Sequence, residues 1–405
     1  MSLPRVCASP APAVLPPPTD SPAFGAAVRS LWRFGENVAY LNHGAFGATP
    51  VPVLAALHRW QQRIEEAPGP FMVGDLPGLL RKTASAVAAA FGVSGPQLVL
   101  TDNATTAINA VLNSFPFRND DRILLTCHTY GAIRHAVRHR AAGTGLGVDE
   151  AVPPFPLPDA AALEAAVLAA CTPRTRLAIL DHIVSETGQV WPLAPVIAAL
   201  KARGCVVLVD GAHAPGHIPL HVPALGADLY VGNLHKWLFT PRSCAFLWAA
   251  PDLPFPLHPT VISWGLNQGL AAEFDWVGTR DPSPWLCATE GLAFLNHFGF
   301  ENISGYNRAL SQQAVDHLTR LWAVSGPVFP PALHSVLRLV PLPKSIPADE
   351  AGSRALQTRL WQEHRLHVAL IRLHGRLWVR LSTQIYNTLD DYDRLGQAIL
   401  RIQTE

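Results

Sequence analysis

The sequence predicts an α/β protein with a mostly parallel sheet covered by helices on both faces, followed by a smaller α+β domain. Two observations support this. Between about residues 97 and 248, short apolar runs alternate with stretches of helical periodicity. From about Pro282 the alternation stops, and long helical stretches precede two strand-like runs. Strands that alternate with helices along a chain are typical of βαβ units, whose strands are parallel.

The expected strands of the sheet are short apolar runs bounded by polar or small residues, a pattern that indicates burial on both faces. They cover residues 97–100, 122–126, 177–182, 205–209, 228–231 and 244–248. Helices are expected at 104–113, 132–142, 160–170 and 193–203. In the C-terminal part we expect helices at 285–297, 304–322 and 389–403, and strands at 335–340 and 376–381.

Composition argues for a soluble enzyme and against several other classes. The chain has 405 residues, 49% hydrophobic and 15% charged, with a net charge of +1. A near-zero charge without a basic tract predicts no nucleic-acid partner. No apolar run approaches the roughly 20 residues of a membrane helix, so no membrane partner is expected. The six cysteines form no CxxC pair, which favours neither zinc nor disulfides. We therefore expect a cytoplasmic protein.

Lys236 is the most informative residue. The chain has only four lysines, and this one follows a strand-like run in the motif Asn-Leu-His-Lys-Trp. The preceding strand ends in Asp210. A buried strand that delivers an Asp, followed by one that delivers a Lys, suits an enzyme that uses pyridoxal 5'-phosphate (PLP). The lysine forms a Schiff base with the aldehyde, and the aspartate pairs with the protonated ring nitrogen.

Three further motifs lie where strands end, which is where ligands bind in open α/β sheets. Ala104, Thr105 and Thr106 open a helix and offer N–H and hydroxyl groups to a phosphate, although, taken alone, such a helix start is usually an ordinary N-cap. Tyr130 could stack on a cofactor ring or be a core tyrosine. Ser185, in the stretch 181–188, could reach the cofactor or the substrate, or belong to a polar loop.

Arg380 lies on an expected strand near the C-terminus. A guanidinium group is a bidentate clamp for a carboxylate, such as the α-carboxylate of an amino acid. A surface ion pair is the alternative explanation.

Together these residues resemble the class V aminotransferase group of fold-type I PLP enzymes. The resemblance is nearest to the isopenicillin N epimerase-like branch, with cysteine desulfurases and selenocysteine lyases as cousins. It spans residues 40 to about 390 in the expected order. The matching stretches are 40–47, 103–109, 130–132, 181–188, 209–216, 233–237, 278–281 and 380–387.

The resemblance implies an architecture. A large PLP-binding domain, residues 71–283, would hold a mostly parallel seven-stranded sheet, and residues 284–405 would form the small α+β domain. Residues 25–70 would pack on the small domain and line the active-site entrance. Residues 1–24, rich in Pro and Ala and without the apolar core of a signal peptide, are expected to be a disordered tail.

It also implies roles at the cofactor. Lys236 would carry the Schiff base and shuttle the proton at Cα, and Asp210 would hold the pyridinium nitrogen. His213 would lie near the ring 3-oxygen, where Ser185 replaces the asparagine of the desulfurases. Tyr130 falls where the desulfurases place their ring-stacking histidine.

Further roles concern the phosphate and the substrate. Thr105 and His235 would bind the phosphate. Thr279 would reach the phosphate of the neighbouring subunit, which makes the protein a homodimer with active sites at the subunit interface. Arg380 would take the carboxylate of an amino-acid substrate. Asn42 and His43 would line the entrance.

The reaction is expected to proceed from the Lys236 Schiff base through loss of the Cα proton to a quinonoid. We rank β-elimination from a cysteine-type thioether first, as a C–S lyase, because it asks least of the site. The last cysteine is Cys287, so residues 341–354, the counterpart of the desulfurase catalytic loop, lack the cysteine that forms a persulfide. Epimerisation, which needs a second acid, is the alternative. Decarboxylating, oxidative or aminotransferase chemistry, with a role in natural-product biosynthesis, is a further one.

Overall fold

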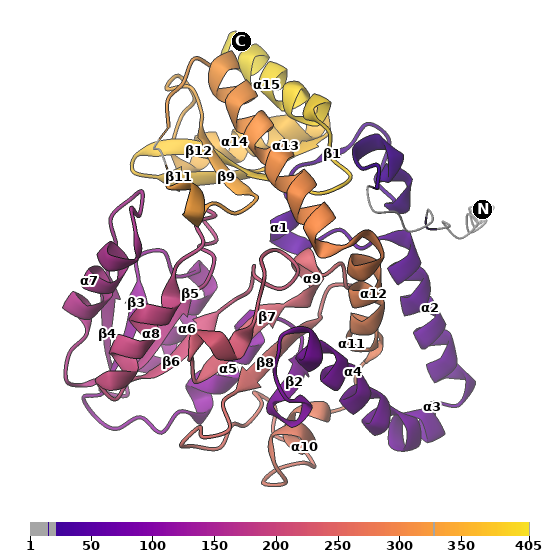
Figure 1. Cartoon of the computed structure of the whole chain (residues 1–405), viewed down its shortest axis with the longest axis vertical. Helices are drawn as coiled ribbons and strands as arrows, with labels where there is room; N and C mark the ends of the chain where they lie inside the picture. Colours follow the sequence, from indigo (N-terminus) through magenta and orange to yellow (C-terminus); the bar gives the residue numbers. More distant parts are fainter. Residues whose placement is uncertain (1–14, 16–21, 327–328, 405) are drawn as a thin grey trace.

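The computed structural model describes Leu15, residues 22–326 and residues 329–404. The tail expected over residues 1–24 therefore lies almost wholly outside the described residues. Figure 1 shows a large lower part built around one sheet and a smaller upper part that contains the C-terminus. None of the helices in the described ranges is both long and apolar enough to cross a membrane.

The central sheet has seven strands within the described ranges, in the order β2-β8-β7-β6-β5-β3-β4. β8 runs antiparallel to its neighbours β2 and β7, and the other pairs are parallel. This confirms the predicted α/β class with a mostly parallel sheet. The strands are β2 (Leu98–Thr101), β3 (Arg122–Thr126), β4 (Gly147–Ala151), β5 (Thr175–Asp181), β6 (Val206–Asp210), β7 (Leu229–Asn233) and β8 (Ala245–Ala249).

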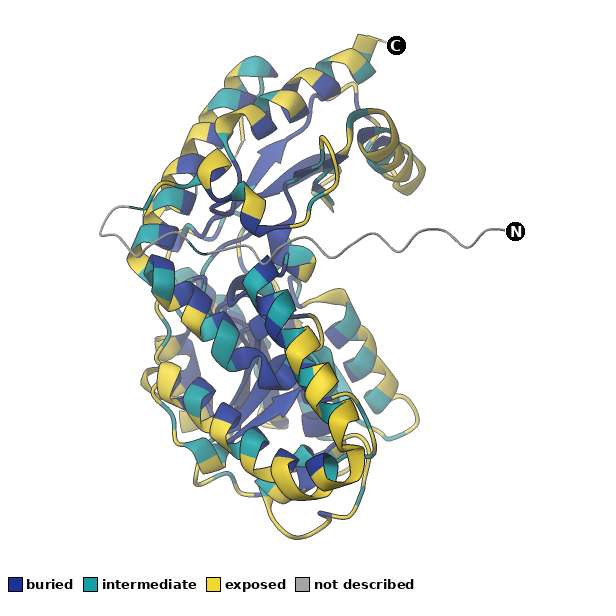
Figure 2. Cartoon of the chain, turned by 90° about the vertical axis from the view of Figure 1, so that its right-hand side faces the viewer, coloured by how far each residue is buried: buried dark blue, intermediate teal, exposed yellow. Residues whose placement is uncertain are grey.

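Alternate residues of each central strand enter different cores, because successive side chains of a strand point to opposite faces. Leu177 and Ile179 of β5 pack into a core shared with α5 and α6, whereas Ala178 and Leu180 join one shared with α7 and α8. The helices are α5 (Ala104–Ser114), α6 (Gly131–Ala141), α7 (Ala160–Ala170) and α8 (Leu193–Ala202). Figure 2 shows the strands buried inside helices whose outer faces are exposed.

The edge strand β4 was not predicted from the sequence. Its residues include Asp149 and Glu150, and all but the last are only partly buried or exposed. An edge strand with one solvated side lacks the apolar run that marks a central strand, so the signal is absent.

The C-terminal part has its own three-stranded antiparallel sheet, in the order β11-β12-β9. Ala39 and Leu41 from the N-terminal segment join its apolar core, and β1 pairs with β10. The elements are β1 (Ala39–Tyr40), β9 (Leu337–Pro341), β10 (Leu366–His367), β11 (Ala369–Leu373), β12 (Arg376–Ser382), α13 (Phe300–Leu321), α14 (Glu350–His364) and α15 (Leu389–Thr404).

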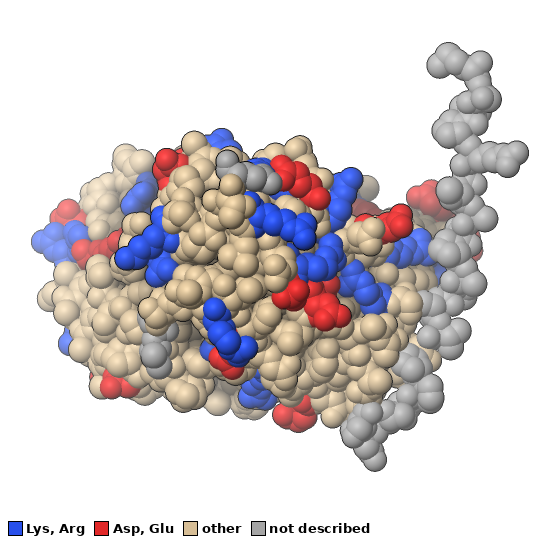
Figure 3. Space-filling model, turned by 90° about the horizontal axis from the view of Figure 1, so that it is seen from above, with Lys and Arg blue, Asp and Glu red and all other residues tan. Residues whose placement is uncertain are grey.

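The remaining helices connect the two parts or cover the large one. They are α1 (His43–Phe46), α2 (Val51–Glu66), α3 (Pro68–Pro70), α4 (Leu76–Ala90), α9 (Leu234–Trp237), α10 (Leu270–Asp275), α11 (Ser283–Leu286) and α12 (Ala288–Phe298). α1 and α9 contact each other between the two parts of the molecule (Figure 1). Seen from the small-domain side, basic and acidic side chains are intermingled on the surface (Figure 3).

Gly47 permits the close approach of α1 to α9. Its φ is +64°, a left-handed value that favours glycine, and a Cβ atom here would lie 1.8 Å from the carbonyl oxygen of His235. The residue after that carbonyl is Lys236, so this contact fixes the backbone that carries the lysine.

We expect Gly47→Ala to lower the free energy of unfolding by about 2–4 kcal/mol, because it combines a strained backbone with a clash against main chain. Urea denaturation checks this. Gly78→Ala in α4 is the matched control, since nothing lies within 4 Å of a Cβ there. The control should be neutral or more stable by up to about 1 kcal/mol. Equal stability of both variants would contradict the account.

Candidate active site

A cavity of about 320 Å³ lies at the carboxyl ends of the central strands. The site residues gather there because parallel strands end at one edge of a sheet. Its lining includes Ala45, Phe46, Asp102, Asn103, Ala104, Thr105, Tyr130, Asp181, Ile183, Ser185, Asp210, Ala212, His213, Asn233, His235, Lys236, Arg242 and Ser243. We call it the inner cavity.

Lys236 lies on α9, the single turn that follows β7. Its Nζ is 3.0 Å from Nε2 of His213. Burial, with a smaller contribution from the charge of Arg380, lowers the pKa of Lys236 to about 7, against the opposing effects of Asp210 and Asp181. The amine is therefore largely unprotonated just above neutrality, which is the form that attacks a carbonyl.

Asp210 ends β6 and is 5% exposed. Its Oδ1 accepts a hydrogen bond of 3.0 Å from the backbone N–H of Ala212. Burial raises the pKa of this carboxyl, whereas the Ala212 hydrogen bond and the charge of Lys236 favour the ionised form. A buried carboxylate with few protein donors suits pairing with a cationic ring nitrogen.

His213 links the lysine to the neighbouring loop. Its Nε2 lies 3.3 Å from Oγ of Ser185, and its Nδ1 has no hydrogen-bond partner among the described residues. Burial and then the nearby charges of Lys236 and Arg380 hold its pKa well below the usual value, so the imidazole is neutral. A neutral ring can accept one hydrogen bond and donate another.

The N-terminus of α5 faces the cavity, but most of its donors are already used. Asn103 caps the helix by accepting from both the N–H (2.8 Å) and the hydroxyl (3.2 Å) of Thr106. The N–H of Ala104 donates to Oδ1 of Asn233, at 2.9 Å. Phosphate binding by Ala104 and Thr106 stays a prediction, although these donors already have protein partners. Ala104 and Thr105 both line the inner cavity.

The other groups at this end of the cavity are His235, Arg242 and Ser243. His235 Nδ1 lies 2.9 Å from the carbonyl oxygen of Cys244, and burial lowers its pKa to about 4. Arg242 adds a cationic side chain that we did not predict from the sequence. It sits in a loop after α9 with no regular spacing to the other site residues, so the sequence offered no signal.

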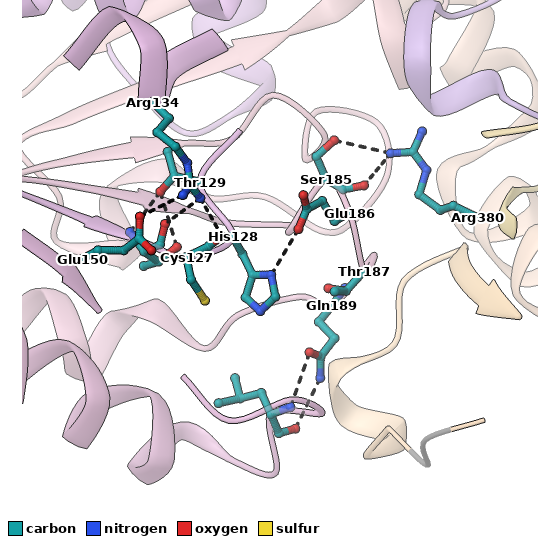
Figure 4. A network of polar contacts seen from close by, with 12 residues as sticks. Cys127, His128, Thr129, Arg134, Glu150, Ser185, Glu186, Thr187, Gln189 and Arg380 are labelled. Carbon is teal, nitrogen blue, oxygen red and sulfur yellow. Dashed lines mark hydrogen bonds and ion pairs between the residues drawn. The ribbon is translucent and has the colours of Figure 1, made fainter. Parts of the chain in front are cut away.

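Arg380 lies on β12 of the small domain and is 5% exposed, so the surface ion pair is excluded. Its Nη2 donates to Oδ1 of Asn42 at 3.0 Å, and its Nη1 donates to the carbonyl oxygen of Ser185 (Figure 4). Burial lowers its pKa to about 10, against the opposing effects of Tyr130, Tyr40 and Glu186. The guanidinium remains charged at neutrality.

An outer cavity adjoins the inner one and shares Tyr130, Ser185, His213 and Lys236 with it. Arg380 and Asn42 line this outer cavity. The arrangement places a carboxylate-binding group and a reactive amine on one continuous lining. Tyr130 is half exposed, so it is not a core tyrosine.

Two predicted residues lie elsewhere. His43 is fully buried, with Nδ1 2.9 Å from Oη of Tyr386 and Nε2 2.8 Å from the carbonyl oxygen of Lys236. The prediction that it lines the entrance is wrong, and it holds the backbone of Lys236 instead. Thr279 is exposed and is absent from the lining of both cavities.

His128 and Glu186 form a further pair in the site, close to Ser185 in Figure 4, that we did not predict from the sequence. Nδ1 of His128 lies 3.3 Å from Oε2 of Glu186, which lines the outer cavity (Figure 4). Burial by itself lowers the pKa of His128, but interactions with Cys127 and Glu186 outweigh it and raise the pKa to about 9. The two residues are 58 positions apart, and no spacing in the sequence joins them.

These residues fit PLP. The site offers an amine with a pKa near 7, a buried carboxyl for the ring nitrogen, a neutral histidine with an unpaired Nδ1, and Thr105 and Arg242 on the cavity lining for the phosphate. The fold and site together define a fold-type I PLP-dependent enzyme.

Comparisons with known proteins agree. The profile of the family Aminotransferase class-V matches residues 50–338. Isopenicillin N epimerase of Streptomyces clavuligerus is 31% identical over 384 residues, covering 89% of this chain and 94% of that protein. L-cysteine desulfhydrase of Arabidopsis thaliana is 30% identical over 402 residues, covering 90% of this chain and 88% of that protein. The chain therefore belongs to the class V aminotransferase family.

Solved structures show the same fold. The cystine C-S lyase C-DES, in complex with its reaction product cysteine persulfide, superposes with a TM-score of 0.73 at 24% identity, covering 90% of this chain and 97% of that one. The apo cysteine desulfurase from Thermococcus onnurineus NA1 gives a TM-score of 0.78 at 18% identity, covering 95% and 100%. The protein is a PLP-dependent lyase or epimerase that acts at Cα of an amino acid.

We expect the apoprotein to capture PLP through Lys236 with a rate that rises with pH through about 7. The free amine reacts, and an ordinary lysine would show the rise only near pH 10.5. Stopped-flow absorbance checks this. Lys236→Ala should lose the visible band, whereas Lys82→Ala, which changes an exposed lysine, should keep it. A band that persists in Lys236→Ala would refute the assignment.

Proposed function

We propose that the protein is a C–S lyase that cleaves L-cysteine or a cysteine thioether by β-elimination. Bound PLP withdraws electrons from Cα of the amino acid. Arg380 holds the α-carboxylate, and Asp210 pairs with the ring nitrogen. Lys236 takes the proton from Cα, and the Cβ–S bond then breaks. With one water consumed, the products are a thiol (or sulfide), pyruvate and ammonium.

The observation that carries this proposal is the single amine poised for proton transfer. Among the described residues lining the two cavities, Lys236 has a pKa near 7. Burial holds the pKa of His213 and that of His235 well below this value, so both rings are neutral. β-Elimination needs one base at Cα and a leaving group at Cβ. Epimerisation needs a second acid on the opposite face, matched to the first.

Similarity to the desulfhydrase of Arabidopsis thaliana supports the same reaction. The persulfide chemistry of a desulfurase lacks its nucleophile here, since no cysteine lines either cavity within the described chain. Cys287 is fully buried, and burial raises the pKa of its thiol further above the usual value. A buried neutral thiol is inert.

An epimerase is the second candidate, favoured by 31% identity to isopenicillin N epimerase. Tyr130 and Glu186 both line the outer cavity, so either could supply the second acid. The two functions differ in their products, which makes them separable in one experiment.

We expect L-cysteine conjugates incubated with PLP-loaded protein in D₂O to yield pyruvate and free thiol, followed by NMR. Lys236→Ala is the inactive control. Deuterium at Cα with accumulating D-isomer and no pyruvate would overturn the lyase and establish the epimerase. Unchanged substrate across a panel of conjugates and other L-amino acids would reject both.

We also propose a homodimer in which Thr279 reaches the phosphate of the neighbouring subunit. Thr279 is exposed and does not line the cavities of its own subunit, which is what a residue that binds the phosphate in the partner subunit requires. Large apolar side chains are also exposed in the loop before α10: Val261 54%, Ile262 53%, Trp264 86% and Leu266 43%. Clustered exposed apolar groups are typical of interfaces.

We expect sedimentation to show a dimer, and Thr279→Ala to weaken PLP binding roughly 10-fold, equivalent to about 1.4 kcal/mol for one lost hydrogen bond. Mixing Thr279→Ala with Lys236→Ala subunits should restore PLP capture with wild-type affinity in one site of each mixed dimer. If mixing leaves only the weakened affinity, Thr279 serves its own subunit or none.

A further inference from the structure

Asp181 is a second buried carboxyl group in the active site. It is the last residue of β5 and pairs in register with Asp210, the last residue of β6. Residues in register on adjacent parallel strands, about 4.8 Å apart, point to the same face. Both carboxyl groups line the inner cavity, and Asp181 is only 3% exposed. The fold thus places two acids side by side.

The surroundings of the two acids differ. Asp210 accepts a hydrogen bond from Ala212 and feels the charge of Lys236, and both stabilise an anion. Asp181 accepts a backbone hydrogen bond from Tyr130, but its Oδ2 is buried without a hydrogen-bond partner among the described residues. An ionised oxygen in that position would be costly, because nothing replaces its lost hydration.

The charged groups around Asp181 also favour a proton on Asp181 and the negative charge on Asp210. The titratable side chains that interact with it are Asp210, Glu186, His128 and Lys236. Burial raises its pKa most, the carboxylates of Asp210 and Glu186 raise it further, and His128 opposes them. His128 is itself hydrogen-bonded to Glu186, so the carboxylate of Glu186 offsets much of the positive charge of His128. Two close acids cannot both ionise cheaply, and the better stabilised one, Asp210, keeps the charge.

We propose that Asp181 is a positioning residue that carries a proton at neutral pH, so that the pair presents a single negative charge, on Asp210, to the ring nitrogen of PLP and to Lys236. A second negative charge here would stabilise the ammonium form of Lys236, since Asp181 acts on that amine. The protonated Asp181 therefore keeps Lys236 a free amine near neutrality. A lyase and an epimerase both need the free amine of Lys236, so a proton on Asp181 would serve either reaction.

The proton can be observed directly in the apoprotein. Infrared spectra of protein labelled with ¹³C-aspartate should show the carbonyl stretch of a protonated aspartic acid at neutral pH. The band should be missing in Asp181→Asn. Its absence from the wild-type spectrum, or its full persistence in a folded Asp181→Asn variant, would overturn the proposal. The wild-type measurement stands even if the variant does not fold.

The pH dependence of PLP capture tests the consequence for Lys236. Asp181→Asn replaces a neutral acid by a neutral amide of the same shape, so the midpoint should stay at the wild-type value near pH 7. Asp210→Asn removes the ionised carboxylate and should move the midpoint to lower pH, which proves that the assay senses a lost charge. A fall of the midpoint in Asp181→Asn as large as in Asp210→Asn would mean that Asp181 is ionised, and the proposal would fail. Neither readout depends on the products formed from an amino acid.

Discussion

Burial of the amine of Lys236 is the constraint on which the rest of the site depends. An ammonium group removed from water loses its hydration, so the neutral amine is favoured and the pKa of Lys236 falls to about 7. That shift requires a water-poor setting, which the strand ends, α1 and the small domain provide together. It also requires that the surrounding charges nearly cancel, because uncompensated carboxylates would restore the ammonium and more cations would weaken the amine as a base.

The neighbours of Lys236 satisfy this balance mainly by being neutral. Burial lowers the pKa of His43 and His217 to about 3 and holds that of His213 well below its usual value. These rings therefore add hydrogen bonds without adding charge. Arg380 is the cation, and Asp210 the anion that we assign to the site. The result is an environment in which one amine can exchange a proton near neutral pH.

The substrate side of the site exists only because two parts of the chain meet. Arg380 comes from β12 of the small domain, Ser185 from the loop after β5, and Asn42 from the N-terminal segment. Their hydrogen bonds hold the guanidinium on the lining of the outer cavity. A change in the packing of the small domain would therefore move the carboxylate clamp relative to Lys236, because α9, which carries Lys236, directly follows β7 of the large domain.

The sequence by itself determined the α/β class and the pair Asp210 and Lys236, because Asp210 ends an apolar strand, Lys236 closely follows the next one, and parallel strands deliver their ends to one edge. It also singled out Arg380, whose strand was readable. Tertiary structure alone decided that His43 is buried beneath Lys236, that Asn103 and Asn233 occupy the donors of Thr106 and Ala104, and that Asp181 lies beside Asp210. These relations depend on strand register and on contacts between distant residues, such as His43 and Lys236, which are 193 positions apart. Local sequence patterns carry no information about such distant pairings, since only the packed chain brings the partners together.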